Sequence, residues 1–494
     1  MKAVGCAMQV DDMSISEFIA GLLADGVERL RAGLIGEGAP VPGPFGTKPL
    51  IYADYVASGR ALRQVEEFVT HRVLPYYANS HTEASFCGRY MTRMRQAARA
   101  HIARICGAGD GFSTVFCGSG ATAGLNRLVH LFGVSDAVAA GPRPVVFIGP
   151  YEHHSNILPW RESGADIIVI DEAPHGGPDL GHLERALAAT DPAALRIGAF
   201  SAASNVTGII TDVDAVTRVL RAHGALSVWD YAGGGPYLPI DMKAGTACEK
   251  DAVVISPHKF VGGPAASGIM IVRDATVGRT RPVFPGGGTV RFVSPWGHDY
   301  AESLTSREEA GTPNIIGDIR AGLAFLVKEA MGQDWLDARH ATLRERAMQA
   351  WQRNPHITIL GNPAASHCLP IFSIQVHDTR QGGLIHQQLF TRLLSDLYGI
   401  QARGGCACAG PYAHSLLGID QFMSEELRQN ILNGNEIRKP GWTRLNFCAL
   451  TDDHKADFII RSVNELAVSP YPMADTYSCD METARFQAMT TEMV

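Results

Sequence analysis

The chain has 494 residues, of which 46% are hydrophobic and 19% charged, and its net charge at pH 7 is −7. This composition is typical of a folded protein with two or three domains, and it excludes a disordered chain. Because the net charge is small, it gives no general attraction to nucleic acid or to an anionic membrane. We therefore expect neither as a partner.

Ten cysteines are scattered along the chain, a density too low for a secreted disulfide scaffold. The N-terminal sequence MKAVGCAMQVDDMSISEF lacks the apolar core of a signal peptide. No apolar run approaches the length of roughly 20 residues that a membrane helix needs. These features predict a soluble protein of a reducing compartment, the cytoplasm.

Residues 14–33 carry apolar side chains at helical spacing, and the Gly- and Pro-rich sequence GEGAPVPGPFGTKP after them predicts a linker. From about residue 50 to 275, short apolar runs alternate with helical stretches. The runs are STVFC, VVFIG, DIIVID, RIGAFS, LSVWD and DAVVIS. Such alternation predicts an α/β fold with a mainly parallel sheet, and the runs are too apolar to face water.

After about residue 275 the pattern loosens. FPGGGTVRFVSP predicts a loop or hairpin, and a helical stretch follows from Ile315 to about Gln352. The strands ITIL, FSIQV and TRLNF then alternate with helices, as in a smaller α+β domain, before a C-terminal tail with little periodicity. We predict an N-terminal helical extension with linker (1–50), a large domain (51–330) and a small domain with tail (331–494).

Small residues follow the first of these strands. The sequence GSGATAGLN, Gly118–Asn126, leads from STVFC into a helix, whose N-terminal N–H groups favour a phosphate, and Thr122 adds a hydroxyl. The same letters satisfy the dinucleotide pattern Gly-x-Gly-x-x-Ala. No acidic residue ends the next strand as ribose binding requires, so a nicotinamide dehydrogenase is a distant alternative.

Polar side chains follow the later strands at the edge where α/β sheets bind ligands. His153 comes after VVFIG, Asn205 after RIGAFS, and Asp230 ends LSVWD. Lys259 comes after DAVVIS. A buried carboxylate needs a positive partner, and a lysine is seldom buried alone. Pyridoxal phosphate would use all of these groups, since it has a phosphate, a flat ring, a phenolic oxygen, a ring nitrogen that wants an acid and an aldehyde that wants an amine.

At this point the sequence resembles the class V branch of pyridoxal-phosphate enzymes, and within it the cysteine-desulfurase-like proteins. The resemblance covers about residues 50–465. It is carried by SGATAGLN (119–126), EHHSNILPW (152–160), SPHK (256–259), EEAGTPN (308–314), RGGCACAGP (403–411) and GWTRLNF (441–447). It implies the pyridoxal-phosphate-dependent transferase fold of type I, with a large domain built on a mainly parallel sheet and a smaller α+β domain.

The resemblance also implies roles for the strand-end residues. Lys259 would be the Schiff-base lysine, and His258 would lie beside the cofactor phosphate. Asp230 would keep the ring nitrogen protonated, and His153 would stack on the ring. Asn205 would reach the phenolic oxygen and the substrate.

Further matches concern the phosphate and the substrate. Ala121, Thr122 and Ser256 would bind the phosphate. Thr312 would reach the phosphate of a neighbouring subunit, which implies a homodimer. Arg444 matches the arginine that grips the substrate carboxylate, a task suited to a planar guanidinium. One departure is Gly233, which stands in DYAG where the family has a glutamine that touches the phenolic oxygen.

The resemblance places the nucleophile of a desulfurase in GIQARGGCACAGPY. The family pattern Arg-x-Gly-x-x-Cys runs from Arg403 to Cys408, with Cys406 as a neighbouring thiol. Attack requires the thiolate, which a positive charge such as Arg403 favours. Two alternatives stay open: both cysteines could bind a metal with His414 or Cys448, although no metal is expected, or they could be unreactive.

We therefore expect an enzyme that removes sulfur from L-cysteine, giving alanine and a persulfide on Cys408 that a sulfur-acceptor protein could take over. A class V aminotransferase, epimerase or hydrolase acting on another amino acid would share the site without needing Cys408. A non-catalytic scaffold is the remaining alternative, and Lys259 and Asp230 argue against it.

Overall fold

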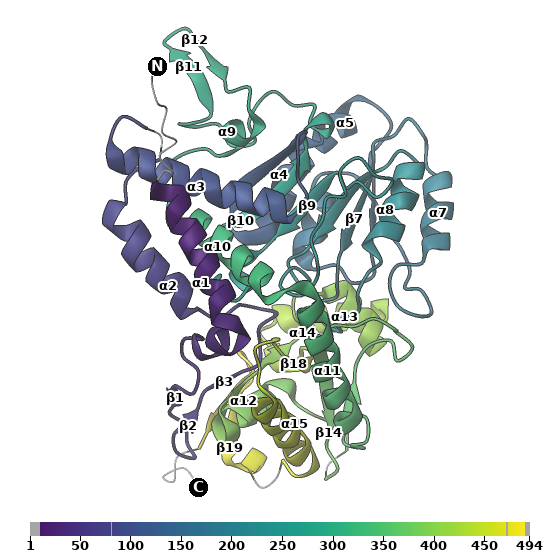
Figure 1. The fold of residues 1–494 in the computed structure, drawn as a ribbon. Coiled ribbons are helices and arrows are strands. Elements are labelled where there is room, and N and C mark those ends of the chain that lie inside the picture. Colours follow the sequence, from purple (N-terminus) through teal and green to yellow (C-terminus); the bar gives the residue numbers. More distant parts are fainter. Residues whose placement is uncertain (1–9, 81, 381, 471–472, 490–494) are drawn as a thin grey trace.

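The computed structural model describes residues 10–80, 82–380, 382–470 and 473–489. The first nine residues of the expected N-terminal extension and the last five of the expected tail lie outside this described part. Figure 1 shows an upper body built around a large sheet and a lower body built around a smaller one. Among the described residues, no helix is both long and apolar enough to cross a membrane.

The large sheet has seven strands in the order β4-β10-β9-β8-β7-β5-β6. Strands β5 to β9 pair with one another in parallel, while β10 runs antiparallel to both β9 and β4. This confirms the expected α/β class with a mainly parallel sheet. The strands are β4 (Phe112–Gly118), β5 (Val145–Ile148), β6 (Asp166–Val169), β7 (Arg196–Ser201), β8 (Leu226–Asp230), β9 (Ala252–Ile255) and β10 (Gly268–Arg273).

Helices cover both faces of this sheet, and so its central strands are apolar throughout. One face packs against α3 (Phe86–Ile105), α7 (Leu180–Ala188), α8 (Val213–Ala222) and α10 (Ile315–Met331). The other packs against α4 (Gly120–Leu131), α5 (Val134–Ala140) and α6 (Leu158–Glu162). Strand β6 departs from the expectation of full burial, because it is the edge strand and both its ends are exposed.

The expected helical stretch from Ile315 to about Gln352 consists of two helices. Helix α10 ends at Met331, and α11 (Gln333–Trp351) begins after Gly332, whose φ of 78° lies where glycine is favoured. Helix α10 stays against the large sheet, whereas α11 belongs to the lower body (Figure 1). The glycine therefore redirects the chain from one body to the other.

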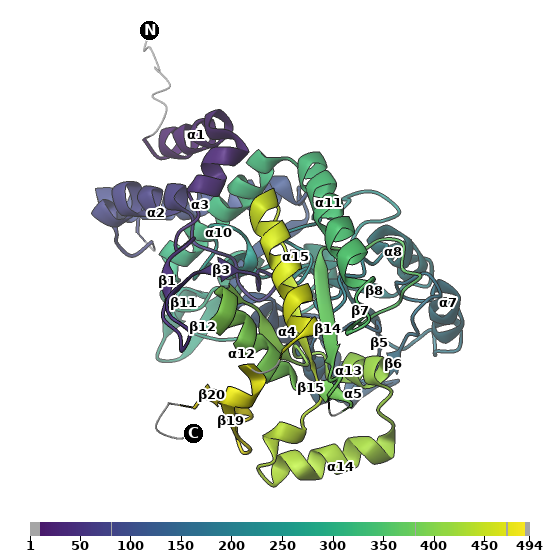
Figure 2. The same cartoon turned by 90° about the horizontal axis from the view of Figure 1, so that it is seen from below.

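The smaller sheet has five strands and packs against α11, α12 (Gln387–Tyr398) and α15 (Asp453–Val468), which lie side by side in Figure 2. Helices α13 (Gly410–Leu417) and α14 (Gln421–Leu432) follow the sheet's strand β17, and the C-terminal tail forms a hairpin against α12. The strands are β13 (Ile357–Ile359), β14 (Ile371–His377), β15 (Leu384–Ile385), β17 (Arg403–Gly405) and β18 (Trp442–Asn446), with β19 (Tyr477–Asp480) and β20 (Arg485–Ala488) in the tail hairpin.

The N-terminal segment joins both bodies. Helix α1 (Val10–Ala32), expected over residues 14–33, packs with α10 in one apolar cluster, and the linker holds the short pair β1 (Pro40–Val41) and β2 (Lys48–Pro49). Strand β3 (Ile51–Tyr52) pairs in parallel with β16 (Ile400–Gln401) of the lower body. The chain after β3, leading into α2 (Arg63–Phe68), is thereby brought to the junction of the two bodies. The division at residues 50 and 330 stays a prediction.

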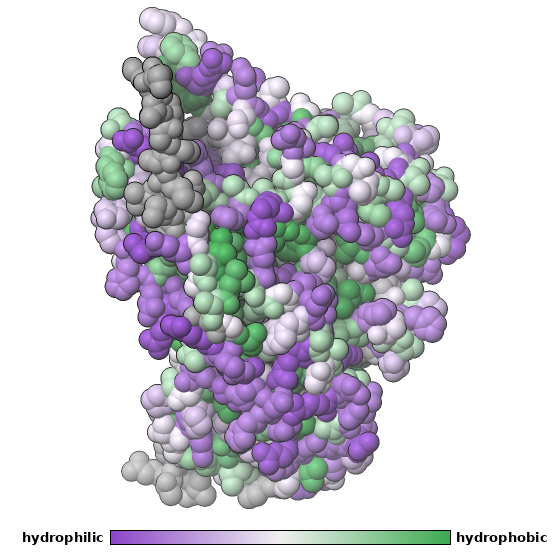
Figure 3. Space-filling model, viewed as in Figure 1, coloured by the Kyte–Doolittle hydropathy of each residue, from purple (hydrophilic) through white to green (hydrophobic). Residues whose placement is uncertain are grey.

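The face drawn in Figure 3 is mainly hydrophilic, with a hydrophobic strip where α1 lies. The hairpin expected in FPGGGTVRFVSP forms as β11 (Val290–Ser294) and β12 (Gly297–Tyr300), and it projects from the top of the upper body beside α9 (Leu304–Glu308). Trp296 at its turn is 93% exposed.

Candidate active site

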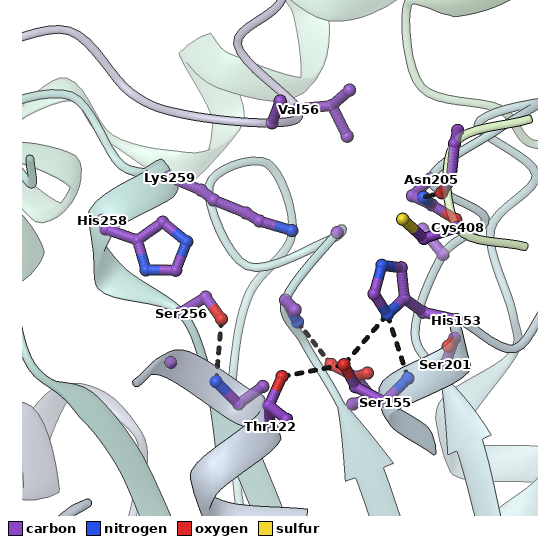
Figure 4. Close-up of a pocket in the computed structure, with 18 of the residues that line it drawn as sticks. Val56, Thr122, His153, Ser155, Ser201, Asn205, Ser256, His258, Lys259 and Cys408 are labelled. Atoms are coloured by element: carbon purple, nitrogen blue, oxygen red, sulfur yellow. Dashed lines mark hydrogen bonds between the residues drawn. The ribbon is translucent and has the colours of Figure 1, made fainter. Parts of the chain in front are cut away.

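A cavity of about 290 Å³ lies where the carboxyl ends of the large sheet's strands meet the lower body. All but one of the predicted site residues line it (Figure 4). The exception is Thr312, which is exposed and outside the cavity. The predicted residues in the lining are Ala121, Thr122, His153, Asn205, Asp230, Ser256, His258, Lys259, Cys408 and Arg444.

One wall of the cavity is the start of helix α4, directly after strand β4. Ser256 Oγ accepts a hydrogen bond from Ala121 N at 2.9 Å. Gly120 has a φ of 60°, and a Cβ there would lie 2.8 Å from Ser256 Oγ and 2.9 Å from His258 Cε1. Only glycine fits this close approach. The resulting polar hollow at a helix N-terminus suits an anionic group such as a phosphate.

Lys259 and Asp230 follow neighbouring strands and are buried beside the same cavity. The amine of Lys259 points into the cavity from the turn after β9 (Figure 4). Asp230 is 3% exposed, and its Oδ1 accepts a hydrogen bond from Ala232 N at 2.7 Å. Burial lowers the pKa of Lys259 to about 8 and raises the pKa of Asp230, and the charge of each limits the shift of the other. Neither forms an ion pair within the described part of the chain.

The two histidines of the cavity are neutral near pH 7. Burial, assisted by the charge of Lys259, lowers the pKa of both His153 and His258 to about 4. His153 Nδ1 accepts a hydrogen bond from Ser155 N at 3.1 Å, which leaves the ring proton on Nε2. A neutral flat ring can lie against an aromatic ligand without the cost of a buried charge.

Cys408 approaches the cavity from the opposite side, on the loop between β17 and α13 (Figure 4). Its side chain is exposed, and the φ angles of Ala407 and Cys408 are 53° and 56°. This left-handed conformation costs about 1–2 kcal/mol for each non-glycine residue. Asn205 Nδ2 donates to Ala407 O at 2.9 Å, so the side chain expected at a phenolic oxygen holds the cysteine loop here. Cys406 does not line the cavity.

Arg444 is fixed by a residue that the sequence did not single out, Asp54. Arg444 Nη2 and Arg403 Nε each donate to one carboxylate oxygen of Asp54, both at 2.8 Å. Arg444 is 3% exposed, and its Nε has no hydrogen-bond partner in the described part of the chain. Arg444 also lines the cavity, where the guanidinium group held by Asp54 can meet a ligand carboxylate. Asp54 is a single carboxylate within the apolar stretch IYADYVA, and this pattern was the sequence signal that could have identified it.

Glu152 is a second residue that sequence reasoning did not assign. It is buried, with Oε1 accepting from Ser201 N at 2.8 Å and Oε2 accepting from Ser201 Oγ at 2.7 Å and from Asn156 Nδ2 at 2.5 Å. Burial raises its pKa to about 7. These bonds fix the segment that carries His153 against strand β7.

The residues proposed for a metal alternative do not form one cluster. Among the described residues, no three His, Cys, Asp or Glu side chains lie together as a metal site would need. His414 bonds instead to Gly410 O at 2.8 Å and to Ser424 Oγ at 2.9 Å. Cys448 is buried in the apolar cluster of α1 and α10.

Known proteins resemble this chain over most of its length. A probable cysteine desulfurase of Vibrio cholerae is 28% identical over 367 residues, which span 74% of this chain and 85% of that protein. A cysteine desulfurase of Serratia proteamaculans is 29% identical over 373 residues, with 74% and 85% covered.

Solved structures share the fold. A cysteine desulfurase from Thermococcus onnurineus superposes with a TM-score of 0.69 at 22% identity, covering 85% of this chain and 95% of that one. One from Escherichia coli gives 0.67 at 22% identity, covering 90% and 98%. This likeness confirms the expected fold. The family model for class-V aminotransferases matches residues 51–427, and the chain belongs to the class-V aminotransferase family.

Proposed function

We propose that the protein is a pyridoxal-phosphate-dependent cysteine desulfurase, which takes sulfur from L-cysteine and leaves alanine. What supports this most is that the amine of Lys259 and the thiol of Cys408 enter one cavity from opposite walls (Figure 4). An amine can bind the aldehyde of the cofactor, and a thiol facing it can attack the sulfur of the substrate. The relatives named as cysteine desulfurases agree with this chemistry.

The residues of the cavity fit the cofactor. The hollow at Gly120, where a Cβ would strike Ser256 Oγ, accepts the phosphate together with Ala121 and Thr122. Asp230 is buried and forms no ion pair among the described residues, with Lys259 as a more distant charge, and this suits a carboxylate that binds a protonated ring nitrogen. Lys259 has a free amine for the aldehyde.

When bound, pyridoxal phosphate supplies an acceptor for the electron pair released at the substrate Cα. Asp230 holds a proton on the ring nitrogen of the cofactor. Arg444, which lines the cavity and is oriented by Asp54, binds the substrate carboxylate through its guanidinium group. Lys259, whose pKa burial lowers to about 8, takes the Cα proton, because a lowered pKa leaves part of the amine neutral near pH 7.

Cys408 performs the sulfur transfer. Its thiolate attacks the sulfur of the substrate, a sulfur–sulfur bond forms, and the Cβ–sulfur bond breaks. The electron pair of the broken bond stays on Cβ, which is protonated as alanine is made. The sulfur remains on the protein as a persulfide of Cys408 until an acceptor protein or a thiol reductant removes it.

The protein acts in the cytoplasm as a homodimer, in which Thr312 of one subunit binds the phosphate at the other's site. The exposure of Thr312 outside its own cavity is compatible with this role. Gly233 lies close to Asn205, with a Cβ there 3.4 Å from that of Asn205. Asn205 Nδ2 uses one N–H for Ala407 O, and its second N–H is the donor that serves the phenolic oxygen in place of the family's glutamine.

The test is the release of alanine and sulfide from L-cysteine under a thiol reductant. Wild type yields both in equal amounts, Cys408→Ala yields neither, and Cys368→Ala, which changes a partly buried cysteine outside the cavity, behaves as wild type. A wild type that carries the cofactor but makes no alanine would instead point to transamination, epimerisation or hydrolysis of another amino acid. Failure to bind the cofactor would point to a scaffold.

A further inference from the structure

His154 holds the loop of Cys408 at two points. The backbone N–H of His154 donates to Cys408 O at 2.9 Å. The side chain of His154 accepts at Nε2 from the backbone N–H of Gly410, at 2.8 Å. The three residues from Cys408 to Gly410 are thus tied to a single residue of another segment.

The conformation held in this way is not one that the loop would keep alone. Ala407 and Cys408 both have left-handed φ angles, which non-glycine residues rarely adopt. Local strain of this kind persists only where the surroundings impose it. The third tie is the hydrogen bond from Asn205 Nδ2 to Ala407 O. Removal of a tie therefore lets the backbone relax and carries the thiol away from its place.

His154 is itself well supported. It begins a short helical turn, His154–Asn156, whose segment is fixed by the buried carboxylate of Glu152. Burial lowers the pKa of His154, so the ring stays neutral and Nε2 remains an acceptor.

His154 does not line the cavity of Lys259 but a neighbouring hollow of about 390 Å³, and so it has no direct part in the chemistry there.

We propose that His154 is a positioning residue that holds the thiol of Cys408 over the cavity. The consequence for turnover rests on the proposed desulfuration. Because Lys259, and not Cys408, removes the Cα proton, loss of His154 slows sulfur transfer while proton removal continues.

The experiment compares four variants of the holoenzyme. His154→Ala removes the acceptor, and His154→Gln restores one near the position of Nε2. Gly410→Ala disturbs the same bond from the other side, because its Cβ would lie 2.9 Å from His154 Nε2. His130→Ala is the matched control, since His130 lines the same outer hollow from helix α4.

Three rates are measured for each variant. They are alanine formation from L-cysteine, exchange of the Cα hydrogen of L-alanine with heavy water, and alkylation of Cys408 by iodoacetamide. Alkylation is followed by fragmentation of the peptide that holds Cys406 and Cys408, which separates the two thiols. In His154→Ala and Gly410→Ala, alanine formation falls about 10- to 100-fold, the loss that a displacement of about 1 Å can cause. Cα exchange stays at the wild-type rate. Alkylation of Cys408 becomes faster by about 3-fold or more, because the loop is released. His154→Gln recovers most of the activity.

Equal losses of alanine formation and Cα exchange in His154→Ala would overturn the proposal, because they would mean a general defect of the site. Unchanged alkylation in both His154→Ala and Gly410→Ala would overturn it as well. The alkylation rates do not depend on the reaction. A wild type that makes no alanine would refute the desulfuration and leave the positioning of Cys408 to be decided by alkylation alone.

Discussion

The wall of the cavity that carries Lys259 is made of strand ends, whereas the wall that carries Cys408 is a loop fastened by hydrogen bonds. Lys259 follows β9, whose four residues are all buried, and Gly120 closes on Ser256 with no room for a Cβ. Cys408 is exposed, has a left-handed φ and is held through its backbone carbonyl by His154 N.

The difference fits the roles that we propose for the two groups. A lysine that binds a cofactor and moves a proton works best when its surroundings fix it to within a fraction of an ångström. A thiol that carries sulfur away has to be reached by a reductant or an acceptor, so it needs exposure and a conformation that can be released. Exposed loops with few buried contacts are where such motion is found.

The largest expected effect is at Lys259, on the wall of the cavity that is made of strand ends. In Lys259→Ala, we expect alanine formation to fall by about 10²- to 10⁴-fold, as for loss of a general base, and the visible absorbance of lysine-bound cofactor to vanish. Lys250→Met is the matched control, since Lys250 is a buried lysine just before β9, at the strand's other end, where it pairs with Asp214. It should lower stability and keep the absorbance. Retained absorbance in Lys259→Ala would refute the assignment.

A smaller effect is expected where the two walls meet, at Asp54. Asp54→Asn leaves the guanidinium groups of Arg444 and Arg403 without their shared carboxylate. We expect KM for L-cysteine to rise about tenfold, equivalent to about 1.4 kcal/mol, with a much smaller change in kcat.

Asp251→Asn serves as control for Asp54→Asn, because Asp251 is also buried and pairs with Arg273 away from the cavity. It should affect stability without changing KM. A lower KM in Asp54→Asn would show that Asp54 competes with the substrate carboxylate instead of orienting Arg444.

The smallest effect concerns pH. In the folded cofactor-free protein burial lowers the pKa of Lys259 from 10.5 to about 8. Between these two values the unfolded chain binds more protons than the folded one, so stability rises with pH. We compare the urea midpoints of cofactor-free wild type and Lys259→Met. We expect the midpoint of wild type, relative to that of the variant, to rise between about pH 8 and pH 10.5. A constant difference between the two proteins would contradict the burial of a charged amine.

The strand ends were predictable from sequence because one rule links local pattern to position. Parallel strands bring their carboxyl ends to one edge, so Asp230 and Lys259 could be placed together although the sequence separates them. The same rule does not reach Asp54, which contacts Arg444 across 390 positions of the chain. That contact depends on the pairing of β3 with β16, two short strands with no distinctive pattern.

The backbone interactions of the cysteine loop also could not be predicted from the sequence. His154 stands beside His153 in EHHSNILPW, and nothing in this sequence indicates a bond to Gly410. The left-handed angles of Ala407 and Cys408 run against the preference of both residue types, and only the surrounding ties impose them. In the same way, the break at Gly332 was missed because an isolated glycine is often tolerated within a helix.

The most direct test of the account is the location of the transferred sulfur. Cofactor-loaded wild type is treated with L-cysteine without reductant and then alkylated. The peptide that contains both Cys406 and Cys408 is fragmented in a mass spectrometer to locate the added mass. We predict one added sulfur atom on Cys408, and no added sulfur on any peptide in Cys408→Ala. Alanine formed with the added sulfur on Cys406, or persisting in Cys408→Ala, would contradict the assignment of Cys408 as the group that accepts sulfur.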